Sequence, residues 1–469
     1  MLFNSLEFLL FFPSVVILYF ALPHKFRWVF LLAASYYFYM NWKPIYAILI
    51  FFSTLITWGC GLLVERSQSK SRKKTFLVLS LIINFSILFT YKYFNFLNES
   101  VFNVLDLMNI RWEVPNLDLL LPVGISFYTF QAVGYTIDVY RGELKAEKNL
   151  GIYALFVSFF PQLVAGPIER AKNLLPQFRE VHYYDASRLE SGIKQMIWGF
   201  FMKLVVADRL SLIVNTAYNN VEAHNVVTLL IATVFFAFQI YCDFAGYSNI
   251  AIGASRIMGF DLMTNFKRPY LATNITDFWR RWHISLSTWF KDYLYIPLGG
   301  NRVSAAKNYF NVFITFLVSG IWHGANWTFV IWGSLHGIYN ALQKLLGIDQ
   351  IRFSRFSGFK LLMIFINFIL VTLAWVFFRA NTTTDGFSII GKIFTDHGVP
   401  FVDPPTLLFG VFGLSILLIK EISEEFFPNT NLFFESKKPL VSAFAAALVV
   451  IIVLSIGVFD GGQFIYFQF

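Results

Sequence analysis

The chain has 469 residues, of which 57% are hydrophobic and only 14% are charged, and its formal net charge is +9. Soluble domains carry about 25% charged residues, so this composition excludes an ordinary soluble protein and indicates a chain that folds in lipid. The excess positive charge lies mostly in loops on one side of the predicted membrane helices, so we expect contact with membrane lipid and no nucleic-acid partner. The two cysteines, Cys60 and Cys242, lie in apolar runs and exclude a disulfide framework.

Apolar segments of about 20 residues, the length that crosses a hydrocarbon core of roughly 30 Å, recur along the chain. The first, near 2–22, has no basic region before it, so we expect a retained helix with its N-terminus outside rather than a cleaved signal peptide. Helices near 28–43 and 44–64 follow. The next loop, ERSQSKSRKK (65–74), holds five basic residues and one acid, and the positive-inside rule places it in the cytoplasm.

A helix near 75–97 then leads to the loop 98–118, which holds one arginine and four acids, as expected of an outside loop. A helix near 119–140 returns to the basic segment RGELKAEKN (141–149). The following segment, GIYALFVSFFPQLVAGPIER (151–170), is short and interrupted by proline and glycine, and both its flanks lie inside. We therefore predict a re-entrant segment, which requires protein or a water-filled cavity around its backbone.

Helices near 193–215 and 226–247 precede a long cytoplasmic stretch that ends at about residue 307. Within it, FWRRWHISLSTWFKDYLYIPLGGNR (278–302) combines aromatic and basic side chains, which is typical of an interfacial or re-entrant helix. The uncharged run 308–343 would be about 54 Å long as one helix, enough for two crossings with a break. The candidate positions for the break are Gly320, Gly324 and Gly333.

Spans near 357–378, 403–420 and 440–458 complete about eleven predicted crossings. The predicted fold class is therefore an all-α polytopic integral membrane protein with transmembrane helices and additional re-entrant or interfacial helices. We expect a single membrane-embedded domain over residues 1–469. The sequence contains no internal repeat, which argues against an inverted-repeat transporter.

Two histidines, His323 and His336, lie with Asn326 in the uncharged run 308–343. Polar residues at membrane depth are costly, and each is a functional hypothesis. A neutral imidazole can accept a proton from a hydroxyl and return one to a leaving group. The alternative is a structural histidine in the core, which fits His336 best because a continuous helix would place it opposite His323. His283, in the RRWH motif, is a further candidate, with an aromatic residue at headgroup level as its alternative.

Several catalytic motifs are missing from the sequence. It contains no GxSxG nucleophile elbow, no HExxH motif, no Walker A motif and no histidine followed five residues later by aspartate. A hydrolase, a zinc protease and an ATPase are therefore poor interpretations. A histidine metal site lacks carboxylate or cysteine ligands beside it, so we predict no metal centre.

Several long motifs, in a fixed order, resemble the membrane-bound O-acyltransferase family, and in particular the branch that contains the bacterial alginate O-acetyltransferases. The motifs lie in a core at 119–345, and after about residue 380 only the hydropathy is similar. They are LPVGISFYTFQAVGYTIDVYRG (121–142), SFFPQLVAGPIER (158–170), QIYCDFAGYSNIAIGASRIMGF (239–260), DFWRRWHISLSTWFKDYLYIPLGGNR (277–302) and IWHGANWTFVIWGSLHG (321–337).

The resemblance implies the fold of that family, in which transmembrane helices surround a central tunnel. It implies that His323 corresponds to the near-invariant catalytic histidine, and that His283 corresponds to the second histidine of this branch. His336 gains little from the resemblance and stays a structural histidine. The implied acyl donor is acetyl-CoA, with no other cofactor bound.

The implied reaction is acyl transfer across the membrane, with His323 as the general base for an acceptor hydroxyl that enters from outside. The phosphates of acetyl-CoA would meet Arg280, Arg281 and Lys291 at the cytoplasmic mouth. An acyl-histidine or other covalent acyl-enzyme step stays open. The candidate donors that would stabilise the tetrahedral oxyanion are Asn326, His283 and Tyr241.

The implied acceptor is an extracytoplasmic partner acetyltransferase that passes acetyl groups to an exported polysaccharide, alginate or an alginate-like polymer. This places the protein in the bacterial cytoplasmic (inner) membrane. Peptidoglycan O-acetylation, teichoic-acid D-alanyl transfer and acetylation of a cellulose-type exopolysaccharide are alternatives within the same class. A transporter or channel, and a scaffold that anchors a periplasmic enzyme, are alternatives from other classes.

Overall fold

The structure is a computed structural model that describes residues 1–164, 166–354, 357–393, 395, 398–430, 434, 436, 438–459 and 464–465. Within these ranges the regular structure is helical throughout, which confirms the predicted all-α fold. The chain forms two compact units: unit 1 contains Met1–Gly192 and Ala251–Met263, and unit 2 contains Ile193–Ile250 and Thr264–Phe469. The single domain expected over residues 1–469, with its core at 119–345, stays a prediction.

Six helices in the described part of the chain are long and apolar enough to cross a membrane. They are α3 (Tyr46–Arg66), the composite helix Lys70–Leu107, α12 (Val226–Ile257), α17 (Gly358–Arg379), α19 (Pro404–Phe426) and α20 (Pro439–Ile456). These helices are those of a multi-pass membrane protein. The total of about eleven crossings stays a prediction, because the other apolar segments form helices that are shorter or less apolar.

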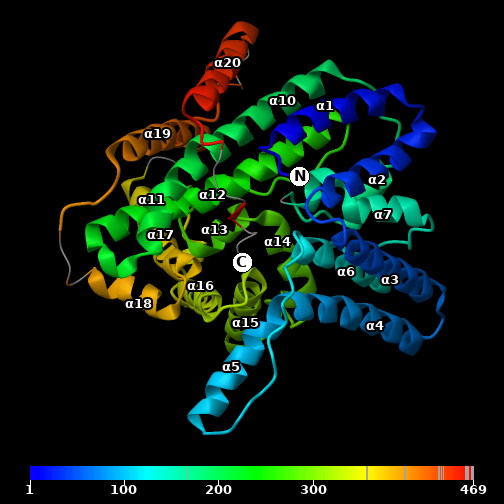
Figure 1. Ribbon diagram of the computed structural model, residues 1–469, viewed down its shortest axis with the longest axis horizontal. Helices are drawn as coiled ribbons and strands as arrows, with labels where there is room; N and C mark the ends of the chain where they lie inside the picture. The colour runs from blue at the N-terminus through cyan, green and yellow to red at the C-terminus, as the bar shows by residue number, and fades with distance from the viewer. Residues whose placement is uncertain are drawn as a thin grey trace. The chain divides into compact units, whose positions relative to one another are not determined.

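Unit 1 begins with the helices that Figure 1 draws in blue and cyan. They are α1 (Leu6–Ala21), α2 (His24–Met40), α3, α4 (Lys70–Leu88), the π-helical turn η1 (Phe89–Tyr93), α5 (Phe94–Leu107) and α6 (Ile125–Arg141). α5 continues past the predicted helix end near residue 97, because two asparagines on it satisfy the backbone of the returning loop. Asn95 donates to the carbonyl of Leu117 at 2.9 Å, and Asn98 donates to that of Val114 at 2.8 Å.

The segment predicted to be re-entrant forms two short buried helices of unit 1, α7 (Leu150–Ser158) and α8 (Phe160–Leu163), before α9 (Ala171–Gln177). The break between α7 and α8 leaves backbone carbonyls without their helical partners. Gln131 and Gln162 both donate to the Phe156 carbonyl, at 2.7 and 2.6 Å. Side chains of the protein therefore satisfy this interrupted backbone, as a re-entrant segment requires.

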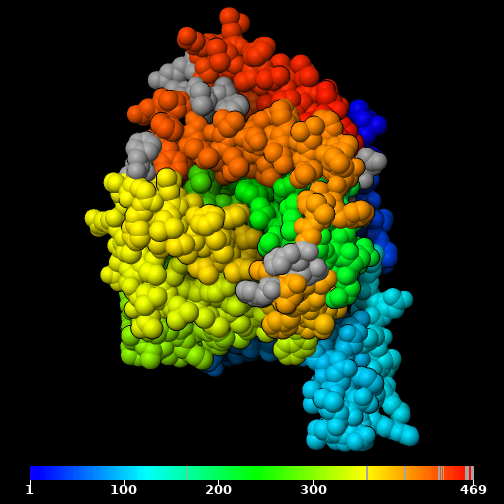
Figure 2. All heavy atoms as spheres, turned by 90° about the vertical axis from the view of Figure 1, so that its left-hand side faces the viewer, coloured from blue at the N-terminus to red at the C-terminus, as the bar shows by residue number. Residues whose placement is uncertain are grey.

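Unit 2 contains the aromatic and histidine-rich motifs. α10 (Ala186–Phe200) leads into it, followed by a π-helical segment η2 (Phe201–Ala207) and α11 (Asp208–Tyr218). In Figure 2, the orange α19 lies beside the green part of this unit, in agreement with the packing of α11 against α19. The remaining helices of unit 2 are α12, α13 (Ile275–Arg281), α14 (Ile284–Phe290), η5 (Lys291–Tyr295), α15 (Ala305–His323), α16 (Trp327–Leu345), α17, α18 (Thr383–Lys392), α19 and α20.

The uncharged run is divided into α15 and α16, and the break lies at Gly324, one of the three predicted positions. The other two glycines lie where the helices cross. A Cβ atom added to Gly320 would lie 3.0 Å from the Cα of Gly333, and it would overlap the carbonyl oxygen of Phe329. Glycine is therefore required for the close approach of the two backbones, as in other small-residue helix crossings in membranes.

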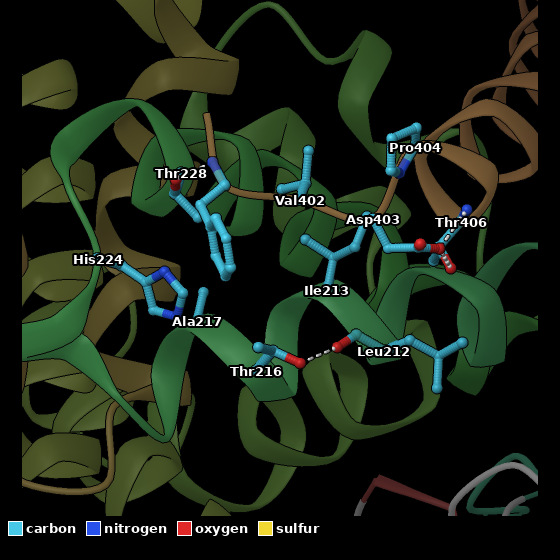
Figure 3. A pocket seen from close by; sticks show the side chains of 11 residues that line it. Leu212, Ile213, Thr216, Ala217, His224, Thr228, Val402, Asp403, Pro404 and Thr406 are labelled. Atoms are coloured by element: carbon cyan, nitrogen blue, oxygen red, sulfur yellow. Dashed lines mark hydrogen bonds between the residues drawn. The ribbon is translucent and has the colours of Figure 1, made fainter. Parts of the chain in front are cut away.

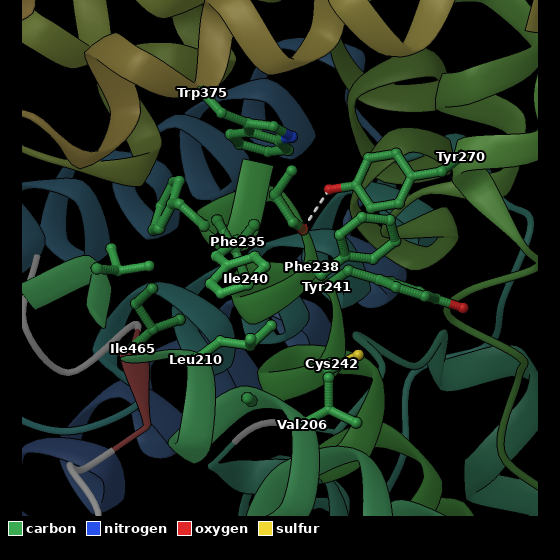
Figure 4. Packing of buried hydrophobic residues seen from close by; sticks show 14 of the residues in the cluster. Val206, Leu210, Phe235, Phe238, Ile240, Tyr241, Cys242, Tyr270, Trp375 and Ile465 are labelled. Atoms are coloured by element: carbon green, nitrogen blue, oxygen red, sulfur yellow. Dashed lines mark hydrogen bonds between the residues drawn. The ribbon is translucent and has the colours of Figure 1, made fainter. Parts of the chain in front are cut away.

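A buried charge cluster joins η2, α11 and α12 and has no counterpart in the sequence predictions. Lys203 Nζ lies 2.7 Å from Asp208 Oδ1 and 2.6 Å from Asp243 Oδ1, and all three side chains are buried. The Ile465 amide donates to the second oxygen of Asp243 at 2.7 Å, so the C-terminal end of the described chain also contacts this cluster. The positive charge of one lysine here offsets the negative charges of two aspartates. The rest of this core is largely apolar, and Figure 4 shows part of its hydrophobic packing.

Candidate active site

His323 is the last residue of α15, and its imidazole is only 2% exposed. Its ring centroid lies 4.9 Å from that of Trp322, 4.9 Å from that of Trp332 and 5.4 Å from that of Phe378. The two tryptophan rings are nearly perpendicular to it, at 79° and 86°. The imidazole is thus enclosed by aromatic walls at the end of a helix, which excludes bulk water from this part of the site.

Gly324 lies between His323 and the start of α16. In the structure a Cβ atom at this position would overlap the Phe329 ring, so the glycine makes room for an aromatic side chain of α16. The same residue also ends α15 in an extended conformation.

His283 lies in the turn between α13 and α14, and its side chain is fully buried. Its backbone has φ +42°, in the left-handed region that non-glycine residues rarely adopt and that concentrates at functional sites. Its ring lies 4.5 Å from Phe244 of α12 and 6.2 Å from Trp322. Trp322 therefore contacts both His283 and His323, and the structure brings the two predicted catalytic histidines to one aromatic partner.

His336 has the arrangement expected of a core histidine. Its Nδ1 accepts a hydrogen bond of 3.2 Å from the indole Nε1–H of Trp279, and its ring is fully buried. Because an indole nitrogen can only donate, the lone pair of His336 Nδ1 is occupied by this bond. A histidine whose basic nitrogen already accepts a hydrogen bond is a poor general base, so the geometry favours a structural role.

Two of the three candidate oxyanion donors direct their hydrogens elsewhere. Asn326 is the N-cap of α16: its Oδ1 accepts from the Thr328 amide at 3.0 Å, and its Nδ2 donates to the Asn381 carbonyl at 3.3 Å. The Tyr241 hydroxyl donates to Glu421 of α19. Sequence reasoning missed Glu421, although a buried acid at the end of an apolar helix is the signal that could have revealed it.

Three indole donors in the same core have no acceptor among the residues that the structure describes. They belong to Trp282, Trp332 and Trp375, each of which is fully buried. Unpaired buried donors are uncommon and cost roughly 1–3 kcal/mol each, so they call for an explanation. Trp332 contacts the His323 ring and stacks on Trp375 with centroids 5.6 Å apart. Its N–H is thus a donor without an acceptor among the described residues, on a ring that contacts His323.

The three basic residues predicted to meet the acyl donor have different environments. Arg280 and Lys291 are exposed. Arg281 instead forms ion pairs with Asp277 at 3.0 Å and with Glu425 at 3.1 Å. These carboxylates offset the charge of Arg281, so Arg280 and Lys291 are the better placed of the three to attract phosphate.

A separate cavity of about 510 Å³ lies between α11, the start of α12 and the chain before α19 (Figure 3). Its lining is largely apolar and includes the side chains of His224, Thr216 and Thr228. None of the predicted site residues lines this cavity. In the described ranges no group of three or more His, Cys, Asp or Glu side chains is arranged to hold a metal ion.

Comparison with known proteins shows the family to which the chain belongs. The chain belongs to the membrane-bound O-acyltransferase family, whose model matches residues 148–384. This range contains every predicted site residue. The protein is therefore a multi-pass membrane O-acyltransferase.

Three kinds of relatives are similar over much of their length. The chain is 39% identical over 400 residues to the probable alginate O-acetylase AlgI of Pseudomonas putida, a match that covers 84% of this chain and 80% of that protein. It is 35% identical over 397 residues to the peptidoglycan O-acetyltransferase of Helicobacter pylori, covering 79% and 74%. It is 32% identical over 288 residues to the teichoic acid D-alanyltransferase of Streptococcus thermophilus, covering 55% and 68%.

Proposed function

We propose that the protein passes acetyl groups from cytoplasmic acetyl-CoA across the bacterial inner membrane for O-acetylation of an exported polysaccharide of the alginate type. The observation that carries this proposal is the contact of both His323 and His283 with Trp322 in a buried aromatic core. Similarity to alginate O-acetylases over 84% of the chain supports the choice of acetyl group and polymer. An extracytoplasmic partner acetyltransferase receives the acetyl group before the polymer does.

The orientation in the membrane follows from the distribution of charge. The loop at 65–74 and the segment with Arg280 and Lys291 lie in the cytoplasm by the positive-inside rule, which places the N-terminus outside. Arg280 lies three residues before His283, whose ring contacts Trp322 together with that of His323. The acyl donor reaches the two histidines from the side of Arg280 and Lys291, and the acceptor hydroxyl reaches them from the opposite face of the membrane.

His323 acts as the general base in this reaction. Its neutral imidazole accepts the proton of the acceptor hydroxyl as the hydroxyl oxygen attacks the thioester carbonyl carbon. The tetrahedral intermediate then collapses: the carbon–sulfur bond breaks, an ester remains, and the imidazolium returns the proton to the thiolate of CoA. The aromatic walls around His323 exclude water, which would otherwise compete with the acceptor for the thioester.

Trp332 is the donor that best fits the developing oxyanion, because its indole N–H has no acceptor among the described residues and its ring contacts His323. A hydrogen bond to a charged group is worth about 1.5–3 kcal/mol, so Trp332→Phe should lower acyl transfer roughly 10- to 150-fold. Trp375→Phe removes a neighbouring indole donor, and Asn326→Asp keeps the helix cap but removes an amide donor. Both controls should stay within a few-fold of wild type, and an equal loss in Trp375→Phe would contradict the assignment.

The function is tested in a deletion strain that is complemented with the wild-type gene. Acetyl ester is measured separately in the isolated surface polysaccharide and in peptidoglycan. The proposal predicts that ester returns to the polysaccharide alone. Return of ester to peptidoglycan alone would instead support the alternative of peptidoglycan O-acetylation, and unchanged ester in both polymers after deletion would contradict acyl transfer to either of them.

A further inference from the structure

Asn265 is a buried residue next to His283, with an exposed fraction of only 1%. Its Oδ1 lies 3.1 Å from His283 Nδ1, and it accepts hydrogen bonds from the Ser285 amide at 3.2 Å and from Ser285 Oγ at 2.9 Å. Its Nδ2 donates to Ser248 Oγ at 3.2 Å. Its backbone carbonyl accepts from the Ile284 amide at 2.9 Å. Asn265 therefore holds both the ring of His283 and the backbone that follows it.

The hydrogen bonds of Asn265 determine which nitrogen of His283 carries the hydrogen. A backbone amide can only donate, so the atom of Asn265 that faces the Ser285 amide must be the oxygen. That oxygen can only accept, and His283 Nδ1 faces it as well, so Nδ1 must carry a hydrogen. Burial lowers the pKa of His283 to about 3, and the ring is neutral with its single hydrogen on Nδ1. The basic lone pair is then on Nε2.

The same reasoning gives His336 the opposite tautomer. Its Nδ1 accepts from Trp279, so its hydrogen is on Nε2 and its lone pair is already used. Unit 2 thus contains two fully buried histidines with contrasting hydrogen-bond partners. Of these two histidines, only His283 has Nδ1 facing a hydrogen-bond acceptor, so its basic lone pair is on Nε2.

We infer that Asn265 is a positioning residue that fixes His283 as the Nδ1–H tautomer, so that His283 presents Nε2 to the reactants as a hydrogen-bond acceptor. This removes His283 from the candidate oxyanion donors, since its single hydrogen is bound to Asn265. It also explains the left-handed backbone at His283: the carbonyl and side-chain oxygens of Asn265 hold the amides of Ile284 and Ser285 directly after the turn. The part of the inference that concerns the reaction rests on the proposed function, whereas the tautomer does not.

The tautomer is measured by nitrogen NMR of protein in which histidine is isotope-labelled. We expect a neutral imidazole with a protonated Nδ1 and a bare Nε2 that disappears in His283→Gln. Asn265→Asp and Ser285→Ala should keep this signal, because each retains an acceptor oxygen opposite Nδ1. Asn265→Leu removes the oxygen that can only accept and leaves Ser285 Oγ, 3.4 Å from Nδ1, which can both donate and accept, so the signal should change to a mixture that includes the Nε2–H form. A bare Nδ1 in wild type, or an unchanged signal in Asn265→Leu, would overturn the inference.

The pH profile of acetyl transfer gives a second test. It would not change if Asn265 had a purely structural role. The ring of His283 faces the uncharged side chains Phe244, Phe266 and Trp322, and its wild-type pKa lies below the usual assay range. Asn265→Asp places a carboxylate against Nδ1, which stabilises the imidazolium and raises the pKa of His283. On acidification, activity should therefore be lost at a higher pH in Asn265→Asp than in wild type.

Superimposable pH profiles for Asn265→Asp and wild type would contradict a role for the His283 lone pair. If Asn265→Leu does not fold, the spectra of wild type and Asn265→Asp still decide the tautomer. If wild type transfers no acetyl group at all, the proposed function fails, while the NMR result on Asn265 stands or falls independently of it.

Discussion

Replacing His323 by glutamine should lower acyl transfer at least about a hundredfold, because positioned general acid–base catalysis contributes roughly 10²- to 10⁴-fold. Glutamine is similar in length to histidine and can remain polar inside the aromatic walls, but it cannot accept and return a proton at working pH. The measurement is acetyl ester in the polymer of a deletion strain that carries equal amounts of either protein in its membrane. Restoration by His323→Gln to the wild-type level would show that His323 is structural.

The matched control for this experiment is His336→Gln. His336 is fully buried and contacts Trp332, as His323 does, with ring centroids 4.9 Å apart in both pairs. A glutamine at this position can still accept the hydrogen bond from Trp279. We expect His336→Gln to keep acyl transfer within a few-fold of wild type and to lower stability by about 1 kcal/mol. If His336→Gln lost as much acyl transfer as His323→Gln, the losses in both variants would be due to disturbed packing rather than to a missing catalytic group.

Lys203→Met should destabilise the protein strongly, by about 3–5 kcal/mol. It removes the cation that lies 2.7 Å from Asp208 and 2.6 Å from Asp243 and leaves two carboxylates in a buried site. Uncompensated buried charge is strongly destabilising, whereas methionine itself fits an apolar core well. The measurement is the thermal unfolding midpoint of the detergent-solubilised protein, together with its amount in the membrane.

Neutralising the whole cluster separates charge from packing. In the triple variant Lys203→Met/Asp208→Asn/Asp243→Asn, no charge remains in the cluster, and the Asp243→Asn change keeps a side-chain oxygen that can still accept from the Ile465 amide. We expect most of the lost stability to return, because buried ion pairs are often replaceable by neutral groups at little cost. A triple variant as unstable as Lys203→Met would indicate that Lys203 matters through its shape or through other contacts.

The helical membrane fold followed from hydropathy and from the placement of glycine. The run 308–343 is too long for one crossing, and Gly324 divides it in the structure because the chain becomes extended there. The roles of Gly320 and Gly333 could not be derived in the same way. Their close approach depends on how α15 and α16 cross, which the sequence of either helix does not contain.

The candidate site shows the same limit. His323 and His283 could be chosen by residue type and by resemblance, since imidazole at membrane depth is an uncommon and functional group. The hydrogen-bond partners of the site residues could not be predicted in this way. Asn326 and Tyr241 are chemically suitable donors, but the first caps α16 and the second donates to Glu421. Asn265 was missed because an asparagine is common in loops, and its importance depends on its position opposite His283 Nδ1.

The most direct test of transfer across the membrane uses inside-out vesicles that enclose alginate and a periplasmic extract. Acetyl-CoA with a labelled acetyl group is added outside, on the cytoplasmic face. We predict base-labile label on the enclosed polysaccharide with the wild-type protein, and no more than background with His323→Gln or with vesicles that lack the protein. Equal labelling with wild type and His323→Gln would contradict the catalytic role of His323, and no labelling with wild type would contradict transfer from acetyl-CoA to this polymer.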